Sequence, residues 1–367
     1  MYNDITCIAD VEKIITKELP VTIVKHPEYK RIFSRNNGHM IRWGKTKEDD
    51  PQYAPMPEIL DLEISIDGCP GAGRGPCEFC YKGNTSAEPT NMSFETFKNV
   101  FDKMKVNLDS VAFGITGVQT NPDFVKMMQY CRENKVVPNF TLSGADLTDE
   151  LAKEISQYVG GLAVSAYESD KNVCYNTVKK FIDLGIEQTN IHLLVSQETL
   201  SFVYEVIEDI KADKRLENLN AVIFLGLKPK GRAKNKFHVV GQNDYTKLVN
   251  YCMHHNIRFG FDSCSAYKFE TAIRSNESLD DNVRKQYLSM SESCESSLFS
   301  AYVDVHGKFW PCSFCEDVEG ITPVDVVDAE DFYRDVWMHP ETIKFRNKLL
   351  GTTEFNCRKC PVYNLDA

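Results

Sequence analysis

Between residues 60 and 262 the chain alternates two patterns of hydrophobic and polar positions. Short runs of aliphatic and β-branched residues predict strands at 62–66, 110–115, 139–142, 161–166, 190–195, 221–225 and 258–261. Between them, hydrophobic residues recur every three or four positions, which predicts helices near 94–105, 122–134, 148–158, 171–184, 199–213 and 243–255. Strands and helices that alternate in this way form right-handed crossovers, so we expect a parallel sheet.

The segment near 94–105 illustrates the helical pattern. Ser93 is a suitable N-cap, because its hydroxyl can accept a hydrogen bond from the first turn. Hydrophobic residues then recur at helical spacing on one face, at Phe94, Phe97, Phe101 and Met104.

The strand–helix units number six, fewer than the eight of a closed barrel. This α/β pattern fits a partial (β/α)6 TIM-type barrel or an open wound sheet. In either fold, ligands gather at the C-terminal ends of the strands.

The alternation stops after about residue 263, where a different composition begins. A hairpin is predicted from Phe299–Val305 and Lys308–Trp310, joined by a turn at His306 and Gly307. We expect a small C-terminal cysteine-rich domain that is held together by metal, because its own core is small. The predicted units are 1–57, an N-terminal extension without a clear pattern, 58–262, the barrel, and 263–367, the cluster-binding domain.

Composition places the chain among ordinary globular proteins, with 367 residues, 42% hydrophobic and 26% charged. The first residues have neither a basic nor an apolar region, so we expect no signal peptide. The longest apolar runs, such as Ala221–Leu225, are far shorter than the ~18 residues of a membrane span. We therefore expect a cytoplasmic protein without a membrane partner.

The formal net charge of −11 argues against a nucleic-acid partner, because phosphate binding depends on clustered Lys and Arg. One basic stretch, 228–236, is the exception. It is either a solvated loop or the one feature that favours modification of a nucleotide or nucleic acid.

Thirteen cysteines are unusual for such a chain. In a reducing compartment, clustered cysteines are metal ligands or catalytic thiols and not disulfides. Cys7, Cys131, Cys174 and Cys252 are isolated, and the last three fall on predicted helices, where we expect buried thiols.

Three cysteines form an early group directly after the first predicted strand, with the spacing Cys69-x7-Cys77-x2-Cys80. Three thiolates can hold three irons of a four-iron cluster and leave the fourth iron open to a ligand. Gly71, Gly73 and Gly75 would let the backbone wrap closely around such a cluster. From these residues alone, a zinc site built on Cys77 and Cys80 is the alternative.

With this group the chain resembles the radical S-adenosylmethionine superfamily, although most members have Cys-x3-Cys-x2-Cys. The resemblance covers residues 60–262 and implies the partial barrel. It also implies cofactor contacts: Phe79 against the adenine, Gly117 and Gln119 in place of a Gly-Gly-Glu stretch, and residues at later strand ends, namely Ser143, Ser165 and Arg232. Gln119 departs from the glutamate that contacts the methionine amino group in the family.

The resemblance implies the family's chemistry, in which Cys69, Cys77 and Cys80 are catalytic. One electron from the cluster cleaves S-adenosylmethionine, and the resulting 5′-deoxyadenosyl radical takes a hydrogen atom from the substrate. It also implies an electron donor such as flavodoxin or ferredoxin.

The late cysteines follow the pattern Cys294-x12-Gly307-x4-Cys312, and then Cys357-x2-Cys360. The predicted hairpin brings Cys294 and Cys312 together, so these four thiolates would form a closed cluster. Cys315 offers a second possibility, because a set made of Cys312, Cys315, Cys357 and Cys360 would suit a zinc ribbon. Cys264 is either a further ligand or a core thiol.

The late pattern resembles the C-terminal extension called SPASM, and more closely its shortened Twitch form. Because seven residues follow Cys360, we expect one auxiliary [4Fe-4S] cluster and a total of two. The resemblance favours modification of a ribosomally made peptide by crosslinking, epimerisation or oxidation. The alternative is oxidation or rearrangement of a small molecule, such as an aminocyclitol, an amino acid or a nucleotide derivative.

Overall fold

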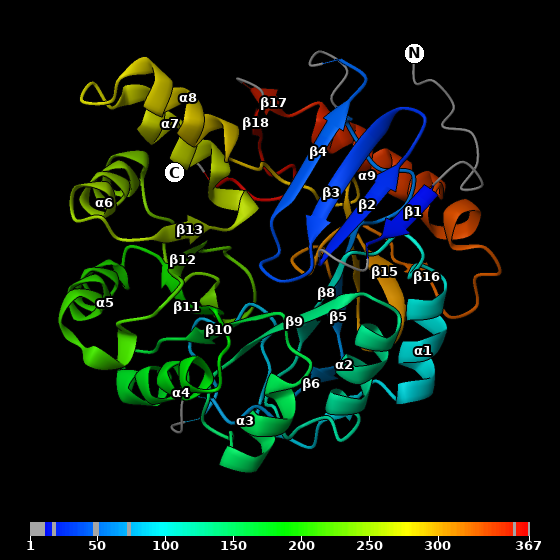
Figure 1. Cartoon of the computed structure of the whole chain (residues 1–367), viewed down its shortest axis with the longest axis horizontal. Helices are drawn as coiled ribbons and strands as arrows, with labels where there is room; N and C mark the ends of the chain where they lie inside the picture. The colour runs from blue at the N-terminus through cyan, green and yellow to red at the C-terminus, as the bar shows by residue number, and fades with distance from the viewer. Residues whose placement is uncertain (1–11, 17–19, 47–50, 72–74, 355–356, 366–367) are drawn as a thin grey trace.

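The computed structural model describes residues 12–16, 20–46, 51–71, 75–354 and 357–365, so Cys7 and Gly73 lie outside the described residues. Its largest feature is an arc of parallel strands with helices on the outer side (Figure 1). In the part of the chain that is described, no helix is long and apolar enough to cross a membrane.

The parallel strands follow one another in sequence order across the sheet, as the pattern predicts. They are β5 (Ile59–Glu63), β8 (Ser110–Gly114), β9 (Val137–Leu142), β10 (Gly161–Ser165), β11 (Gln188–Val195), β12 (Ala221–Gly226) and β13 (Phe259–Phe261). The connecting helices are α1 (Phe94–Asp102), α2 (Phe124–Glu133), α3 (Asp149–Ser156), α4 (Lys171–Asp183), α5 (Leu200–Ala212) and α6 (Gln242–His254). Six helices beside an open parallel sheet confirm the partial (β/α)6 barrel.

Local sequence explains where these helices begin. The side chain of Ser93 accepts a hydrogen bond from Thr96 N at 3.1 Å, which confirms the predicted N-cap of α1. Thr148 caps α3 in the same way, through Leu151 N at 3.2 Å. The isolated thiols Cys131, Cys174 and Cys252 are buried on α2, α4 and α6, as expected.

The first predicted strand, 62–66, is wrong in its bounds. The barrel strand β5 begins three residues earlier, at Ile59, and ends at Glu63. Residues further on form β6 (Ser65–Ile66), which pairs in a separate antiparallel ribbon with β7 (Thr90–Asn91). The apolar run therefore crosses two strands, and the second one leads the chain into the cysteine loop.

The N-terminal residues form an antiparallel sheet that their mixed composition did not predict. Its strands are β1 (Glu12–Ile15), β2 (Val21–Lys25), β3 (Tyr29–Ser34) and β4 (Met40–Gly44). Arg31 on β3 is fully buried and forms ion pairs with Glu58 and Asp109, both at 2.6 Å. This buried charge network fixes the sheet to the start of β5 and β8.

The C-terminal residues extend the main sheet instead of standing apart from it. The predicted hairpin is confirmed as β14 (Ser300–Val303) and β15 (Lys308–Trp310), and β14 lies parallel to β5. Further elements are α7 (Ala266–Ser275), α8 (Asp281–Ser289), β16 (Val324–Asp325), a π-helical turn (Tyr333–Trp337), α9 (Pro340–Leu350), β17 (Thr353–Glu354) and β18 (Cys357–Arg358). The sheet is thus continuous across the predicted boundary at 262/263, and the three unit boundaries stay predictions.

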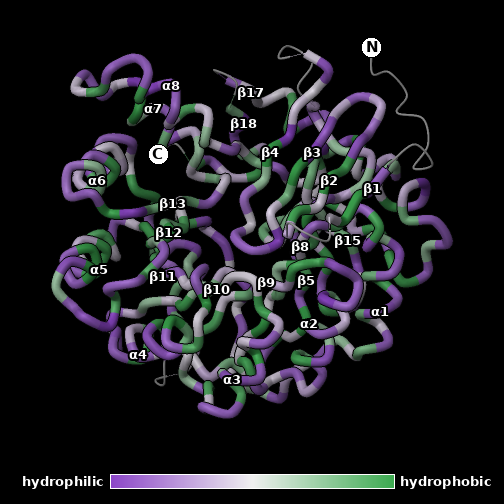
Figure 2. The backbone as a smooth tube through the Cα atoms, in the orientation of Figure 1, coloured by the Kyte–Doolittle hydropathy of each residue, from purple (hydrophilic) through white to green (hydrophobic). Residues whose placement is uncertain are grey.

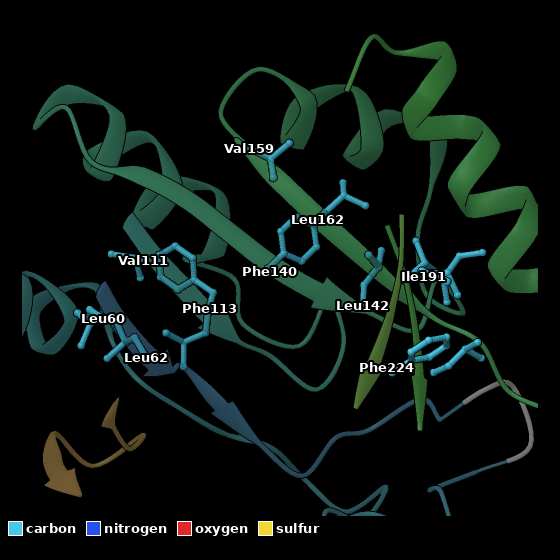
Figure 3. Close-up of a cluster of buried hydrophobic side chains, with 14 of the residues drawn as sticks. Leu60, Leu62, Val111, Phe113, Phe140, Leu142, Val159, Leu162, Ile191 and Phe224 are labelled. Atoms are coloured by element: carbon cyan, nitrogen blue, oxygen red, sulfur yellow. The ribbon is translucent and has the colours of Figure 1, made fainter. Parts of the chain in front are cut away.

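The core fills the space between the parallel sheet and its helices. Side chains on that face of the strands are buried, from Leu60 on β5 to Phe224 on β12 (Figure 3). Figure 2 shows that hydrophobic positions follow the strands, while many outer loops are hydrophilic. The N-terminal sheet joins a second, smaller cluster, in which Tyr29 lies with Phe345 and Leu349 of α9.

Candidate active site

The three early cysteines lie in a loop at the C-terminal end of the first barrel strand. The loop closes on itself, because Cys69 N donates to Thr85 O at 2.9 Å and Cys80 N donates to Cys77 O at 3.2 Å. Gly71 has φ +62°, and a Cβ there would lie 1.8 Å from Gly75 O. Only glycine at position 71 therefore permits this close backbone contact.

The three thiols interact electrostatically. The pKa of Cys77 is raised to about 11, mainly by burial and in part by the thiolates of Cys69 and Cys80. Burial also raises the pKa of Cys69, with a further contribution from Cys80. Thiolates that repel one another at close range suit a cation between them.

The donor chemistry of this loop fits an iron–sulfur cluster, which is held by cysteine thiolates. Within the described ranges, no three His, Cys, Asp or Glu side chains are already arranged as metal ligands. Cys69, Cys77 and Cys80 therefore stay the predicted ligand set.

The loop after β12 holds the cysteine loop in place. Arg232 donates from Nε to Cys77 O at 2.9 Å and from Nη1 to Gly83 O and Asn84 O at 2.7 and 2.8 Å. Gly231 has φ +60°, and a Cβ there would lie 2.5 Å from Cys80 O. The backbone of the loop after β12 thus packs directly against the backbone of the cysteine loop, and this contact holds the cysteine loop in position.

The basic stretch 228–236 is therefore a solvated loop only in its last part. Lys228 is only 5% exposed and forms a short ion pair with Asp262. Lys230 Nζ donates to Ser313 O at 3.4 Å, and Arg232 donates to main-chain oxygens of the cysteine loop, among them Cys77 O. Of the basic side chains in this stretch, only Lys234 and Lys236 are exposed, because Lys228, Lys230 and Arg232 pack between the two cysteine groups.

A cavity of about 640 Å³ adjoins the cysteine loop at the ends of β10 and β11. Phe79 lines it and stacks on Tyr167, with ring centroids 6.0 Å apart and planes at 14°. Phe237 meets Phe79 edge to face, with centroids 5.8 Å apart. Aromatic walls of this kind bind flat ring systems. Cys77 borders the same cavity.

Ser165 ends β10 beside this wall. Its hydroxyl interacts with the phenol of Tyr167, which also hydrogen-bonds the thiol of Cys77. Burial raises the pKa of Tyr167 far above its usual value, so the phenol keeps its proton. The side chain of Tyr167 thus lies between Ser165 and the cysteine loop.

The ends of β8 and β9 form the other side of the site. Gly117 is buried, and a Cβ there would lie 2.6 Å from Asp146 Oδ2 and 3.0 Å from Pro70 Cδ. Gln119 is exposed, its main-chain N donates to Asp146 Oδ2 at 3.0 Å, and its side-chain amide donates to the main-chain oxygen of Asp146. Ser143 accepts a hydrogen bond from Ala145 N at 3.3 Å and so begins the turn that presents Asp146.

The inner face of the barrel is polar, in contrast to the helix-facing side. Asp61, at the middle of β5, lies on the inner face and is accessible to solvent there, and the surrounding barrel raises its pKa to about 6 by partial desolvation. Burial lowers the pKa of His192 to about 4, and its Nδ1 lies 3.4 Å from the Thr141 hydroxyl. A cavity of about 550 Å³ lies between this face and the β3–β4 turn, lined in part by Asn139, Thr141, Asn190 and His192.

The late cysteines gather near the C-terminal end of the barrel. Burial raises the pKa values of Cys294 and Cys357 to about 12, and raises those of Cys264 and Cys360. The thiolate of Cys312 also raises the pKa values of three late cysteines, Cys264, Cys294 and Cys360. The thiolate of Cys294 raises the pKa of Cys357 in the same way. The four predicted ligands are therefore neighbours.

Cys315 and Cys264, the two cysteines outside the predicted set of four ligands, also lie in the late group. Cys315 Sγ is 3.4 Å from Cys312 Sγ, and Cys315 is fully buried. Cys264 lies close to Cys294 and Cys312. Proximity alone therefore leaves both ligand sets open.

An aromatic and ionic bridge links the two cysteine groups. Tyr81, next to Cys80, contacts Phe314 with ring centroids 4.4 Å apart. Lys82 is 9% exposed and pairs with Glu63 at 2.8 Å and, over a shorter distance, with Glu316. The two loops are thus fixed relative to each other.

Sequence reasoning missed three residues of this site: Asp146, Tyr167 and Lys82. Tyr167 carried a usable signal, because it lies two residues after Ser165 and extends the same face of β10. Asp146 and Lys82 lie in loops without a hydrophobic period, and no local pattern indicates them.

No known family profile matches the chain, and a search of curated proteins gives no match. Solved structures do match. SuiB from Streptococcus suis has a TM-score of 0.64 at 12% identity, with 92% of this chain and 89% of SuiB covered. SuiB bound to the precursor peptide SuiA has a TM-score of 0.62 at 14% identity, over 80% of this chain and 67% of SuiB.

A second protein, anSMEcpe with bound AdoMet and the Cp18Cys peptide, has a TM-score of 0.57 at 15% identity, over 80% of this chain and 83% of that one. SuiB and anSMEcpe are radical S-adenosylmethionine enzymes. The likeness confirms that this chain has their fold.

Proposed function

We propose that the chain is a radical S-adenosylmethionine enzyme with a catalytic [4Fe-4S] cluster on Cys69, Cys77 and Cys80. The observation that carries the proposal is the placement of three interacting thiols at the end of the first barrel strand, beside a cavity of about 640 Å³. Three thiolates leave one iron of a four-iron cluster open. The shared fold with enzymes that bind AdoMet supports the same conclusion.

A cluster held by Cys69, Cys77 and Cys80 would supply the electron for reductive cleavage of S-adenosylmethionine and so for hydrogen-atom abstraction from the substrate. The chain's own residues prepare this step. Arg232 and Gly231 fix the cysteine loop, so its thiols keep their positions. Phe79 and Tyr167 offer rings to the adenine and exclude water.

The late thiols are proposed to hold one auxiliary [4Fe-4S] cluster through Cys294, Cys312, Cys357 and Cys360. Four thiolates complete the coordination of a cluster, which suits it to electron transfer. The Tyr81–Phe314 contact supports a direct connection between the two sites. A flavodoxin or ferredoxin is the proposed electron donor.

The proposed substrate is a ribosomally made peptide that is crosslinked, epimerised or oxidised. SuiB and anSMEcpe, which share the fold, have structures with bound peptides.

The catalytic part of the proposal is tested by reducing the anaerobically reconstituted protein in the presence of S-adenosylmethionine. We expect slow formation of 5′-deoxyadenosine and methionine even without substrate. Cys77→Ala should abolish it, because no three-thiolate site remains. Deoxyadenosine formation that persists in this variant would refute the cluster assignment.

The substrate class is tested by deuterium transfer. The reduced enzyme is given a deuterated extract of its source cells, separated into fractions above and below about 1 kDa. If the substrate is a peptide, deuterium should appear in 5′-deoxyadenosine with one of the fractions. Treatment of that fraction with a protease should then abolish the transfer. Transfer from a protease-resistant fraction would instead indicate the small-molecule alternative.

A further inference from the structure

Arg358 is a partly buried cation beside two of the predicted late ligands. It follows Cys357 on β18, and its guanidinium donates to the main-chain oxygen of Cys294 at 2.7 Å and to that of the residue before it at 3.4 Å. Burial raises the pKa values of Cys294 and Cys357, and the charge of Arg358 counteracts the rise in both. This cation therefore acts directly on one half of the ligand set.

The charge of Arg358 is not neutralised by a carboxylate. Its hydrogen-bond acceptors are neutral main-chain oxygens. Glu295, the carboxylate that acts on it from nearby, is already paired with Arg42 at 3.0 Å. A cation that is largely removed from water is stabilised by an anionic neighbour, and among the described residues the late thiolates are the neighbours in that position.

Lys228 is a second cation, and it approaches the late group from the loop after β12. It is 5% exposed, and its Nζ lies 4.8 Å from the centre of the Phe314 ring. A hydrogen bond with its neighbouring thiol raises the pKa of Cys312, burial raises that of Cys360, and the charge of Lys228 counteracts the rise in both cases. The ion pair of Lys228 with Asp262 offsets part of this charge.

Together the two cations act on all four predicted late ligands. A [4Fe-4S] cluster on four thiolates is an anion, and its reduction adds one more negative charge. Cations in a poorly solvated position next to such a cluster stabilise the reduced form more than the oxidised form.

We propose that Arg358 and Lys228 raise the reduction potential of the late cluster, so that the late site holds an electron more firmly than it would without them. The inference rests on the proposed function, in which the four late cysteines hold that cluster. It assigns two residues of this chain to the redox behaviour of the site, and neither residue is a ligand.

The test is a redox titration of the late cluster, followed by electron paramagnetic resonance under anaerobic conditions. The starting protein is the full-length reconstituted chain with the three early cysteines replaced by Ala, so that the signal comes from the late cluster alone. Arg358→Gln and Lys228→Met should each favour the oxidised form about tenfold, which for one electron is a shift of about 60 mV to more negative potential. Lys234→Met, which removes an exposed cation of the same loop, is the control and should leave the potential unchanged because water and salt screen its charge.

Two further variants separate an effect of charge from a loss of packing. Arg358→Lys keeps the cation and should keep a potential close to that of the starting protein. Asp262→Asn removes the anion that is paired with Lys228, so it should shift the potential in the opposite direction, to more positive values. A purely structural role of these residues would not reverse the sign of the shift.

Iron is measured in each variant before its potential. If Arg358→Gln and Lys228→Met keep about four irons and the potential of the starting protein, the inference is refuted while the proposed function stands. If Arg358→Gln loses its iron, Lys228→Met and Asp262→Asn decide: shifts of opposite sign support the inference, and unchanged potentials or shifts in one direction refute it. If the starting protein holds no reducible iron–sulfur cluster, the late cluster of the proposed function fails and the inference fails with it.

Discussion

The early and late cysteine groups lie on either side of the loop 227–233, but their surroundings differ. The early thiols are half-buried and border a cavity of about 640 Å³. In the late group Cys315 and Cys357 are fully buried, the other four cysteines are half-buried like the early ones, and the cavity that Cys264 borders measures about 20 Å³. The two groups therefore differ mainly in the space beside them, which supports the proposal that the early site admits a ligand and the late site does not.

The strongest way to break this comparison is to remove one site and count iron. The reconstituted protein should hold about eight irons and eight sulfides, the sum of two four-iron clusters. Replacing Cys69, Cys77 and Cys80 together by Ala should leave about four of each, because the late site keeps its ligands. Tightly bound zinc with one cluster's worth of iron would show that the late site is a zinc ribbon.

The second prediction concerns which of the late cysteines bind the cluster. If Cys294, Cys312, Cys357 and Cys360 hold the cluster, Cys294→Ser should lose about four irons. Cys315→Ser should retain them, because its thiol only neighbours Cys312 at 3.4 Å. The reverse result in iron analysis would assign the ligands to the ribbon-like set.

A smaller effect is expected where the two regions are joined. Lys82→Met should leave Glu63 and Glu316 buried without their cation and destabilise the reconstituted protein by about 3 kcal/mol. Chemical denaturation under anaerobic conditions measures the change. The control is Lys98→Met, which removes a solvent-exposed ion pair with Asp102 and should change the stability far less. Equal effects for both variants would contradict a structural link at Lys82.

The smallest effect concerns the barrel interior. The pKa of Asp61 is raised to about 6, so the folded state holds this proton more tightly than the unfolded state. Stability therefore falls as the pH rises from about 4 to 6, and the loss stays at higher pH. Asp61→Asn should raise the midpoint of thermal unfolding at pH 7.5 relative to the unaltered protein, but not at pH 4. A shift of equal size at both values would contradict the raised pKa of this carboxyl group.

The sequence predicts the barrel well because each of its helices carries its own amphipathic period. The face with Phe97 and Phe101 is buried against the sheet, as its spacing implies. The N-terminal sheet was missed because its strands place a charge, Arg31, at a buried position. Its partners Glu58 and Asp109 are distant in sequence, so no local pattern indicates the network.

The candidate site shows the same division. The cysteines and the glycines of their loop are visible as spacing, and Gly71 indeed permits a contact that no other residue allows. Asp146 was missed because its place in the site depends on how the turns after β8 and β9 meet. The parallel pairing of β14 with β5 is likewise set by the three-dimensional fold. Sequence therefore located the donor atoms, and the structure located the groups that surround them.

The central claim is that the early site has an open iron and the late site is closed. Electron paramagnetic resonance of reduced protein with and without S-adenosylmethionine tests it directly, in two variants that each keep one site. In Cys294→Ser, which keeps the early cluster, the cofactor should change the spectrum. In the variant without Cys69, Cys77 and Cys80, it should change nothing. A cofactor-dependent change in that second variant, with none in the first, would contradict the account.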